Sequence, residues 1–187
     1  SFEHTLPKEK LEFLLPCPSI GLLDMDENPT LTAFCYGSLN STHGWLAEDF
    51  TLSQRAEMAT WAIKEANRLY PNSVEIGDLN YACSADITAT DALQMGVPCQ
   101  FLSSLGEVKA GNHSTGHLFL ALIRLVLQVG FKIIVIEEVL GILKYANGFY
   151  YKGAIDLILA AGYEYSARVC NAWDHGVPQA RFRLVLT

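Results

Sequence analysis

Two kinds of hydrophobic pattern alternate along residues 31–187. Short runs rich in β-branched and aromatic residues predict strands, and longer segments with apolar residues three or four positions apart predict helices. The expected strands are 31–37, 50–56, 73–79, 91–96, 131–139, 163–173 and 180–187, and the expected helices are 57–71, 114–130 and 148–162.

The alternation of strands and helices predicts an α/β fold, a mostly parallel twisted sheet with helices on both faces. No helix separates the last two strands, so we expect that pair to be antiparallel. In the first helix Met58, Ala62, Ala66 and Leu69 share one face, and Pro71 ends it. Residues 1–30, rich in Pro and Leu, are expected to form an irregular N-terminal arm before a single domain at 31–187.

Composition narrows the class of protein. Half of the residues are hydrophobic and the net charge is −7, which excludes a disordered chain and gives no broad basic surface for nucleic acid. No apolar run approaches the roughly 18 residues of a membrane span, so no membrane partner is expected. The five cysteines form no CxxC pair, so we expect a reducing compartment and no zinc or other metal. The three tryptophans, Trp45, Trp61 and Trp173, are expected in the core.

Ligands of parallel α/β sheets bind at the carboxyl ends of the strands. Gly37, Cys99 and Glu137 each follow or end a predicted strand, so they are expected to converge there. From these residues alone, Cys99 is either a packed thiol or a nucleophile on a loop. Glu137 and Glu138 are either a charged pair closing a strand or a functional carboxyl with a neighbour.

Four segments of the chain resemble those of the cytosine-C5 DNA methyltransferases. "GVPCQFLSS" is similar to the family's Pro-Cys-Gln segment, and "VIEEVLGIL" to its Glu-Asn-Val segment, with Glu138 in place of the asparagine. "NAWDHGVPQARFRLVL" is similar to the segment that ends in Gln-x-Arg-x-Arg, and residues 50–71 match the second cofactor segment. The Glu-Glu variant followed by "GIL" is also similar to the fungal branch linked to repeat-induced silencing.

The resemblance implies a Rossmann-like methyltransferase fold and a set of site residues. The implied catalytic residues are Cys99, Glu137, Gln179, Arg181 and Arg183. The implied contacts to S-adenosyl-L-methionine are Gly37, Glu57, Met58, Asp78, Leu79, Pro98 and Leu118, with Glu57 at the ribose and Asp78 at the adenine. Gln100 and Ser103 are implied in the substrate loop, where 106–116 is either a mobile loop or a plain surface connection.

The implied reaction begins when the Cys99 thiolate adds to carbon 6 of a flipped-out cytosine, which turns carbon 5 into a nucleophile. Glu137 would bind the N3 edge of the ring and share a proton with it, which needs a carboxyl with a raised pKa. Glu138 either raises that pKa by its charge or points to the opposite face of the strand. One arginine would bind the cytosine O2 and the other would hold the loop or Glu137; the alternative is an edge strand with solubilising charges.

The chain also departs from the family pattern. In "CYGSLN" Gly37 fits the first glycine of the first cofactor segment, but Leu39 and Asn40 replace two others, which implies weaker or altered cofactor binding. The target-recognition domain and the last cofactor-covering motif are expected to be missing from 31–187.

Three functions remain open from the sequence. The first is the catalytic part of a DNA cytosine-C5 methyltransferase, with DNA as substrate and recognition supplied by a further domain or partner chain. The second is a methyltransferase-like subunit that acts as a scaffold or regulator, and the third is an RNA cytosine methyltransferase. The expected location is the nucleus of a eukaryote or the cytoplasm of a bacterium.

Overall fold

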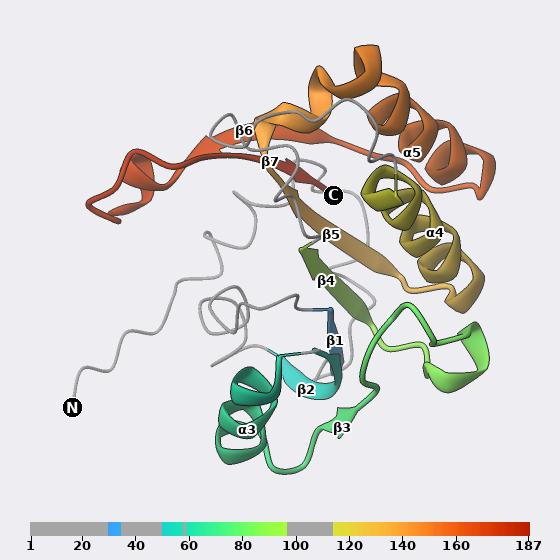
Figure 1. The fold of residues 1–187 in the computed structure, drawn as a ribbon, viewed down its shortest axis with the longest axis vertical. Coiled ribbons are helices and arrows are strands. Elements are labelled where there is room, and N and C mark those ends of the chain that lie inside the picture. Colours follow the sequence, from blue (N-terminus) through green and yellow to red (C-terminus); the bar gives the residue numbers. More distant parts are fainter. Residues whose placement is uncertain (1–29, 35–49, 58, 97–113) are drawn as a thin grey trace.

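One mixed sheet organises the protein. In the computed structural model, which describes residues 30–34, 50–57, 59–96 and 114–187, seven strands are arranged in the order β3-β2-β1-β4-β5-β7-β6 (Figure 1). The strands are β1 Thr30–Phe34, β2 Thr51–Ala56, β3 Val74–Glu75, β4 Ala92–Gly96, β5 Ile133–Glu138, β6 Ala167–Asn171 and β7 Phe182–Leu186.

The strand directions agree with the sequence-based prediction. The pairs from β3 through β5 are all parallel, whereas β7 is antiparallel to both β5 and β6. The carboxyl ends of the five parallel strands therefore meet at one edge of the sheet, and the beginning of β7 joins them. The prediction of a mostly parallel sheet with an antiparallel terminal pair is confirmed.

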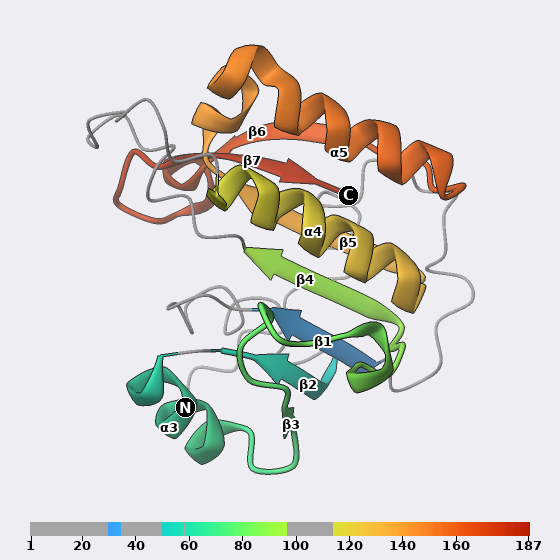
Figure 2. The same cartoon turned by 45° about the vertical axis from the view of Figure 1, so that its right-hand side comes forward.

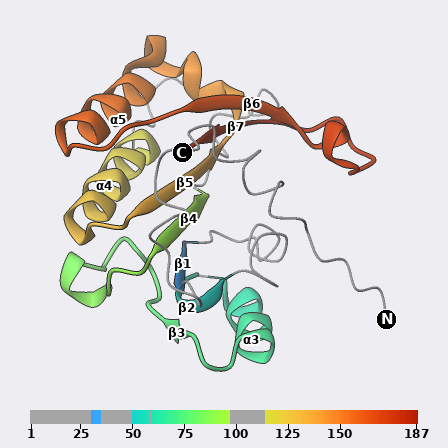
Figure 3. The same cartoon turned by 180° about the vertical axis from the view of Figure 1, so that it is seen from behind.

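Helices cover both faces of the sheet, as predicted. The helices are α3 Thr60–Leu69, α4 Ser114–Val129 and α5 Phe149–Ala160, and the short 3₁₀ turns are η2 Ser84–Asp86, η3 Leu140–Leu143, η4 Tyr145–Gly148 and η5 Ala172–His175. Figures 2 and 3 show α4 and α5 side by side on one face and α3 on the other. No helix in the described part of the chain has the length and apolar character needed to cross a membrane.

The alternation of side chains along each strand divides the core between the two faces. Leu93, Met95, Ile136 and Leu184 belong to a large cluster that includes buried residues of α4 and α5. A second, smaller cluster, against which Tyr70 at the end of α3 packs, consists of Leu31, Ala33, Leu52 and Ala92. Since neighbouring strand residues face opposite sides, this division fixes which face each residue at the strand ends meets.

The helix boundaries follow the predicted signals closely. Ala62 and Ala66, on the predicted inner face of α3, are fully buried, and Leu69 is the last residue of that helix before Pro71. Gly130 follows α4 with a φ of 82°, a left-handed conformation that glycine adopts without strain.

Two expectations from the sequence are wrong. The strand predicted at 73–79 pairs only over Val74–Glu75, because Gly77 turns with a φ of 87° and its N–H bonds to the Glu75 side chain rather than to a strand. Trp61 and Trp173 are each 63% exposed rather than buried. Trp61 lies beside the inward-facing Ala62 on α3, and Trp173 lies in η5, between β6 and β7 and outside the core clusters. Trp45 lies outside the described residues.

Candidate active site

A cluster of one carboxylate and two arginines lies at the edge where the parallel strands end. Glu137 is the fifth residue of β5, and its Oε1 lies 3.1 Å from Nε of Arg183 and 3.9 Å from Nη2 of Arg181. Since β7 is antiparallel to β5, the beginning of β7 reaches the same edge as the end of β5. Both arginines thus lie on the same side of the strand and face Glu137.

The surroundings of this cluster hold it in place while leaving it accessible. The side chain of Glu137 is 35% exposed, and that of Arg183 is 27% exposed. Arg183 also donates from Nη1 to the carbonyl oxygen of Phe182, and the backbone N–H of Arg181 donates to Oδ1 of Asn171. A half-exposed carboxylate with a short ion pair can accept a proton or a hydrogen bond from a ligand at this edge.

Gly96 lies directly beside Glu137. The two residues are register partners in the β4–β5 pair, and a Cβ on Gly96 would lie 3.8 Å from Oε2 of Glu137. The absence of a side chain there leaves the neighbouring strand open next to the carboxylate. Because Gly96 is the last residue of β4, the chain that leaves β4 starts next to Glu137.

Glu138 points to the opposite face, which is the second of the two arrangements expected from the sequence. It is only 3% exposed, and its Oε2 accepts a hydrogen bond of 3.2 Å from the N–H of Val139. Burial raises the pKa of the Glu138 carboxyl to about 8, and the charge of Glu137 acts in the same direction, against the Val139 N–H and Arg183. The Glu138 carboxyl is therefore mostly protonated at pH 7.

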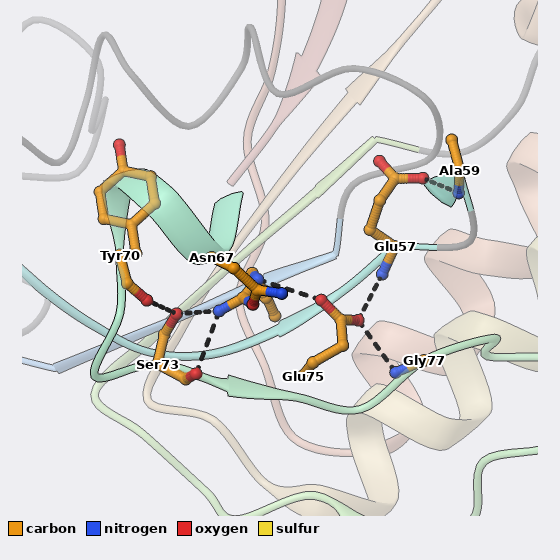
Figure 4. A network of polar contacts seen from close by, with 8 residues as sticks. Glu57, Ala59, Asn67, Tyr70, Ser73, Glu75 and Gly77 are labelled. Atoms are coloured by element: carbon orange, nitrogen blue, oxygen red, sulfur yellow. Dashed lines mark hydrogen bonds and ion pairs between the residues drawn. The ribbon is translucent and has the colours of Figure 1, made fainter. Parts of the chain in front are cut away.

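The predicted cofactor residues lie at the other half of the same edge, at the ends of β2 and β3. Glu57 directly follows β2 and is 3% exposed, and its Oε1 accepts a hydrogen bond of 2.9 Å from the N–H of Ala59. Its own N–H donates to Oε1 of Glu75, which also accepts from the N–H of Gly77, both at 3.0 Å (Figure 4). The Glu57 carboxyl is thus held by the turn that leads into α3.

Asp78 and Leu79 follow β3 by a few residues. Oδ1 of Asp78 accepts from the backbone N–H of Asn80 at 2.9 Å and from its side-chain Nδ2 at 2.7 Å, which fixes a tight turn. Leu79 is buried in the large core cluster. Asp78 thus presents a polar group in this loop, and Leu79 anchors the loop to the core.

Several predicted site residues cannot be placed. Gly37, Met58, Pro98, Cys99, Gln100 and Ser103 lie outside the described residues, and so does the predicted loop up to residue 113. Leu118 belongs to α4, of which only the backbone is described at that position. Gln179 lies exposed before β7, and its N–H donates to the carbonyl oxygen of Val177.

Two features of this edge were not predicted from the sequence. One is the burial of Glu138, and the other is the pair formed by Arg55 in β2 and Glu75 in β3, whose Nε and Oε2 lie 3.0 Å apart. A sequence signal existed for the second, since Arg55 is a charged residue inside a short run with strand character. The described residues contain no group of three or more His, Cys, Asp or Glu side chains placed to hold a metal ion.

Comparison with known proteins finds relatives of this chain. The chain is 31% identical over 110 residues to the type II methyltransferase M.HhaI of Haemophilus parahaemolyticus, covering 59% of this chain and 34% of that protein. It is 30% identical over 139 residues to the type II methyltransferase M.NlaIV of Neisseria lactamica, covering 71% of this chain and 33% of that protein. The matched part thus spans about a third of the length of these relatives.

Solved structures share the fold. The Entamoeba histolytica methyltransferase EhMeth superposes with a TM-score of 0.66 at 16% identity, over 86% of this chain and 52% of that one. The S. pombe Dnmt2 methyltransferase superposes with a TM-score of 0.65 at 15% identity, over 85% of this chain and 50% of that one. The family model described as C-5 cytosine-specific DNA methylase matches residues 34–187. The chain therefore belongs to the C-5 cytosine-specific DNA methylase family.

Proposed function

We propose that this chain is the catalytic part of a DNA cytosine-C5 methyltransferase that uses S-adenosyl-L-methionine. The observation that carries the proposal is the Glu137 carboxylate, which Arg183 and Arg181 hold at the carboxyl edge of the sheet beside Gly96. Cys99 follows Gly96 by three residues in the sequence, and three residues of chain span at most about 11 Å. Covalent connectivity alone therefore keeps the Cα atom of Cys99 within about 11 Å of that of Gly96, the register partner of Glu137.

The residues at the edge divide the chemistry between them. The Cys99 thiolate adds to carbon 6 of a cytosine, and the electron pair displaced from the 5,6 double bond makes carbon 5 nucleophilic. Glu137 holds the N3 edge of the ring and shares a proton there, which disperses the charge of the adduct. Arg183 keeps Glu137 in place, and Arg181, which is 49% exposed at 3.9 Å from Glu137, is the better placed of the two to reach the cytosine O2.

The cofactor residues lie at a suitable separation from Glu137. When bound, S-adenosyl-L-methionine supplies an electrophilic methyl group to carbon 5. Glu57 follows β2, and β2 lies three strand spacings from β5, or about 14 Å. An extended ligand along this edge can therefore contact Glu57 and the Asp78 loop at one end and approach Glu137 at the other.

We also propose that a further domain or partner chain supplies target recognition. Phosphate contacts give most of the affinity of proteins for DNA, and this chain carries a net charge of −7. Arg181 and Arg183 lie within 4 Å of Glu137, so part of the positive charge at this edge is already paired within the chain.

The proposal is tested by trapping the covalent adduct. The full-length protein, with its partner if it has one, is incubated with S-adenosyl-L-methionine and DNA that contains 5-fluorocytosine. Release of the thiolate requires loss of the carbon-5 proton, and a fluorine at that position cannot be removed, so the adduct accumulates. We expect a denaturation-resistant complex with the wild type and none with Cys99→Ser.

If the folded full-length protein, with its partner if it has one, forms no adduct, the methyltransferase proposal is overturned. Calorimetry with S-adenosylhomocysteine separates the alternatives, because a scaffold subunit is expected to bind none. Replacing the DNA with RNA of the same sequence tests the RNA methyltransferase alternative.

A further inference from the structure

We propose that Arg55 and Glu75 are positioning residues for cofactor binding, with the Glu75 carboxylate joining the ends of β2 and β3 into one preformed cradle. This inference rests on the proposed function, since it assigns a role to residues around Glu57 and Asp78. Neither Arg55 nor Glu75 belongs to the site set that the sequence predicts. Figure 4 shows Glu75 between Glu57 and Gly77, with Ser73 and Asn67 on its other side.

The first step of the argument is that Glu75 replaces a missing part of the sheet. The pairing between β2 and β3 covers only Gln54↔Val74 and Arg55↔Glu75, so the backbone ladder stops before Glu57 and Gly77. Beyond that point a single oxygen, Oε1 of Glu75, accepts the N–H groups of Glu57 and Gly77, each at 3.0 Å. The last backbone bond between the two segments runs from the N–H of Ile76 to the carbonyl oxygen of Arg55 at 2.8 Å, and the Glu75 side chain joins the residues that follow it.

The second step concerns what holds Glu75. Its Oε2 lies 3.0 Å from Nε of Arg55, whose side chain is 4% exposed. Nη1 of Arg55 donates to the carbonyl oxygen of Ser73 at 3.0 Å and to the Ser73 hydroxyl, and Nη2 donates to Oδ1 of Asn67 in α3. Arg55 thus connects β2, β3 and α3, and its charge is paired with the Glu75 carboxylate.

The third step is that the two N–H groups bound by Glu75 belong to, or directly precede, predicted cofactor contacts. Glu57 is itself the predicted ribose ligand, and Gly77 precedes Asp78, the predicted adenine ligand. Gly77 has a φ of 87°, so the chain turns sharply just before Asp78. One carboxylate oxygen therefore sets the spacing between the groups expected at the two ends of an adenosine.

An ion pair such as Arg55–Glu75 contributes little to the free energy of unfolding, because the cost of removing the two charges from water offsets much of their attraction. The pair can therefore be neutralised without loss of the fold if shape is kept. This allows a test that separates the hydrogen-bond acceptor at position 75 from the buried charge.

The experiment compares two double variants of the full-length protein. Arg55→Met with Glu75→Gln removes both charges and keeps a side-chain oxygen that can accept the two N–H groups. Arg55→Met with Glu75→Met removes the same charges and has no acceptor. Binding of S-adenosylhomocysteine is measured by calorimetry, and KM and kcat are measured with S-adenosyl-L-methionine.

We expect the glutamine variant to bind within about threefold of the wild type and the methionine variant to bind at least about tenfold more weakly. In the methionine variant the KM for S-adenosyl-L-methionine should rise while kcat changes little, since Cys99 and Glu137 are untouched. Asp91→Asn is the matched control. It disrupts a carboxylate with comparable hydrogen bonds at the opposite ends of the strands, and it should lower stability without changing the affinity.

The inference is overturned if the methionine variant binds S-adenosylhomocysteine as tightly as the wild type. It is also overturned if both double variants lose the same affinity, or if Asp91→Asn loses as much affinity as the methionine variant. These outcomes differ from a failure of the proposed function itself. In that case the wild type would bind no S-adenosylhomocysteine and form no adduct with 5-fluorocytosine DNA.

Discussion

Glu137 and Glu138 are neighbours in the sequence but lie in environments of opposite polarity. Glu137 faces two arginines at the edge of the sheet, whereas Glu138 is buried on the other face, beside its register partner Leu184. The strand period alone accounts for this difference, because adjacent side chains point to opposite sides. The same two-residue stretch therefore supplies a charged group for chemistry and a neutral group for packing.

The neutral state of Glu138 predicts a pH-dependent stability. Glutamate in an unfolded chain has a pKa of about 4.3, whereas burial raises the pKa of Glu138 to about 8 in the folded protein. Between these values the unfolded state has released the proton that the folded state keeps. The contribution of the Glu138 carboxyl to stability is therefore complete below about pH 4 and declines until about pH 8. In Glu138→Gln, we expect thermal unfolding at about pH 5, 7 and 9 to show a smaller decline in Tm than in the wild type.

Because other groups also titrate in this range, the informative quantity is the difference between the two proteins. Parallel Tm curves for the wild type and Glu138→Gln would contradict the neutral, buried state of Glu138. A charge-preserving Glu138→Asp variant should keep a pH dependence.

At the scale of elements, the connection from β5 to α5 contains the most unusual backbone of the described chain. Ala146, Asn147 and Gly148 have φ values of 48°, 55° and 78°, three successive residues in the left-handed region. Asparagine and glycine tolerate this region, but alanine does not, since its Cβ approaches the following carbonyl oxygen. This turn follows the Glu137–Glu138 pair by fewer than ten residues and directs the chain into α5.

We expect Ala146→Gly to stabilise the protein by up to about 1 kcal/mol. Glycine removes the steric cost of the left-handed conformation, but it also increases the conformational entropy of the unfolded chain, which offsets part of this gain. Asn147→Gly should change stability less, since asparagine already tolerates this conformation. Urea unfolding of both variants measures the effect. Destabilisation by Ala146→Gly would show that this backbone strain is not present in solution.

The sequence predicted the elements better than the contacts among them. The β-branched run before Glu137 and the alanine face of α3 identified β5 and α3, because each has one dominant period. The third strand was overestimated, since nothing in "SVEIGDL" indicates that a side chain of its own terminates the pairing at Glu75. For Glu137, the resemblance implied a contact with one arginine as one of two options, whereas both Arg181 and Arg183 lie within 4 Å of it. The Arg55–Glu75 pair did not, because it joins residues twenty positions apart whose register no local pattern specifies.

At the scale of the whole molecule, the sheet has polar anchors at both ends of its strands. Opposite the proposed site, Oδ2 of Asp91 accepts from the N–H and the hydroxyl of Thr30, both at 2.9 Å, and Oδ1 lies 2.9 Å from Nζ of Lys132. These contacts join the beginnings of β1, β4 and β5, and Ile133 adds a backbone bond to the Asp91 carbonyl oxygen. The contacts of Asp91 thus hold the beginnings of the parallel strands together, while the carboxyl ends of the strands carry the candidate active site.

The Asp91 anchor predicts acid sensitivity. The Thr30 N–H and then Lys132 lower the pKa of Asp91 to about 2, below the value of about 3.9 in an unfolded chain. Its contribution to stability is therefore present above about pH 4 and lost as the pH falls towards 2. Asp91→Asn should be less stable at pH 7 by about 1–3 kcal/mol and should lose less further stability between pH 4 and 2. Chemical unfolding at several pH values measures both, and an unchanged pH slope would contradict the assignment.

The position of β7 between β5 and β6 has a consequence for how the protein matures. Residues 182–186 are made after β6, yet they occupy the place next to β5. While a ribosome is still producing them, the carboxylate of Glu137 has neither of its guanidinium partners. Long-range insertions of this kind are slow steps in folding, so the pairing of β7 with β5, and with it the contact of Arg183 with Glu137, is expected to form after the pairing of β5 with β4.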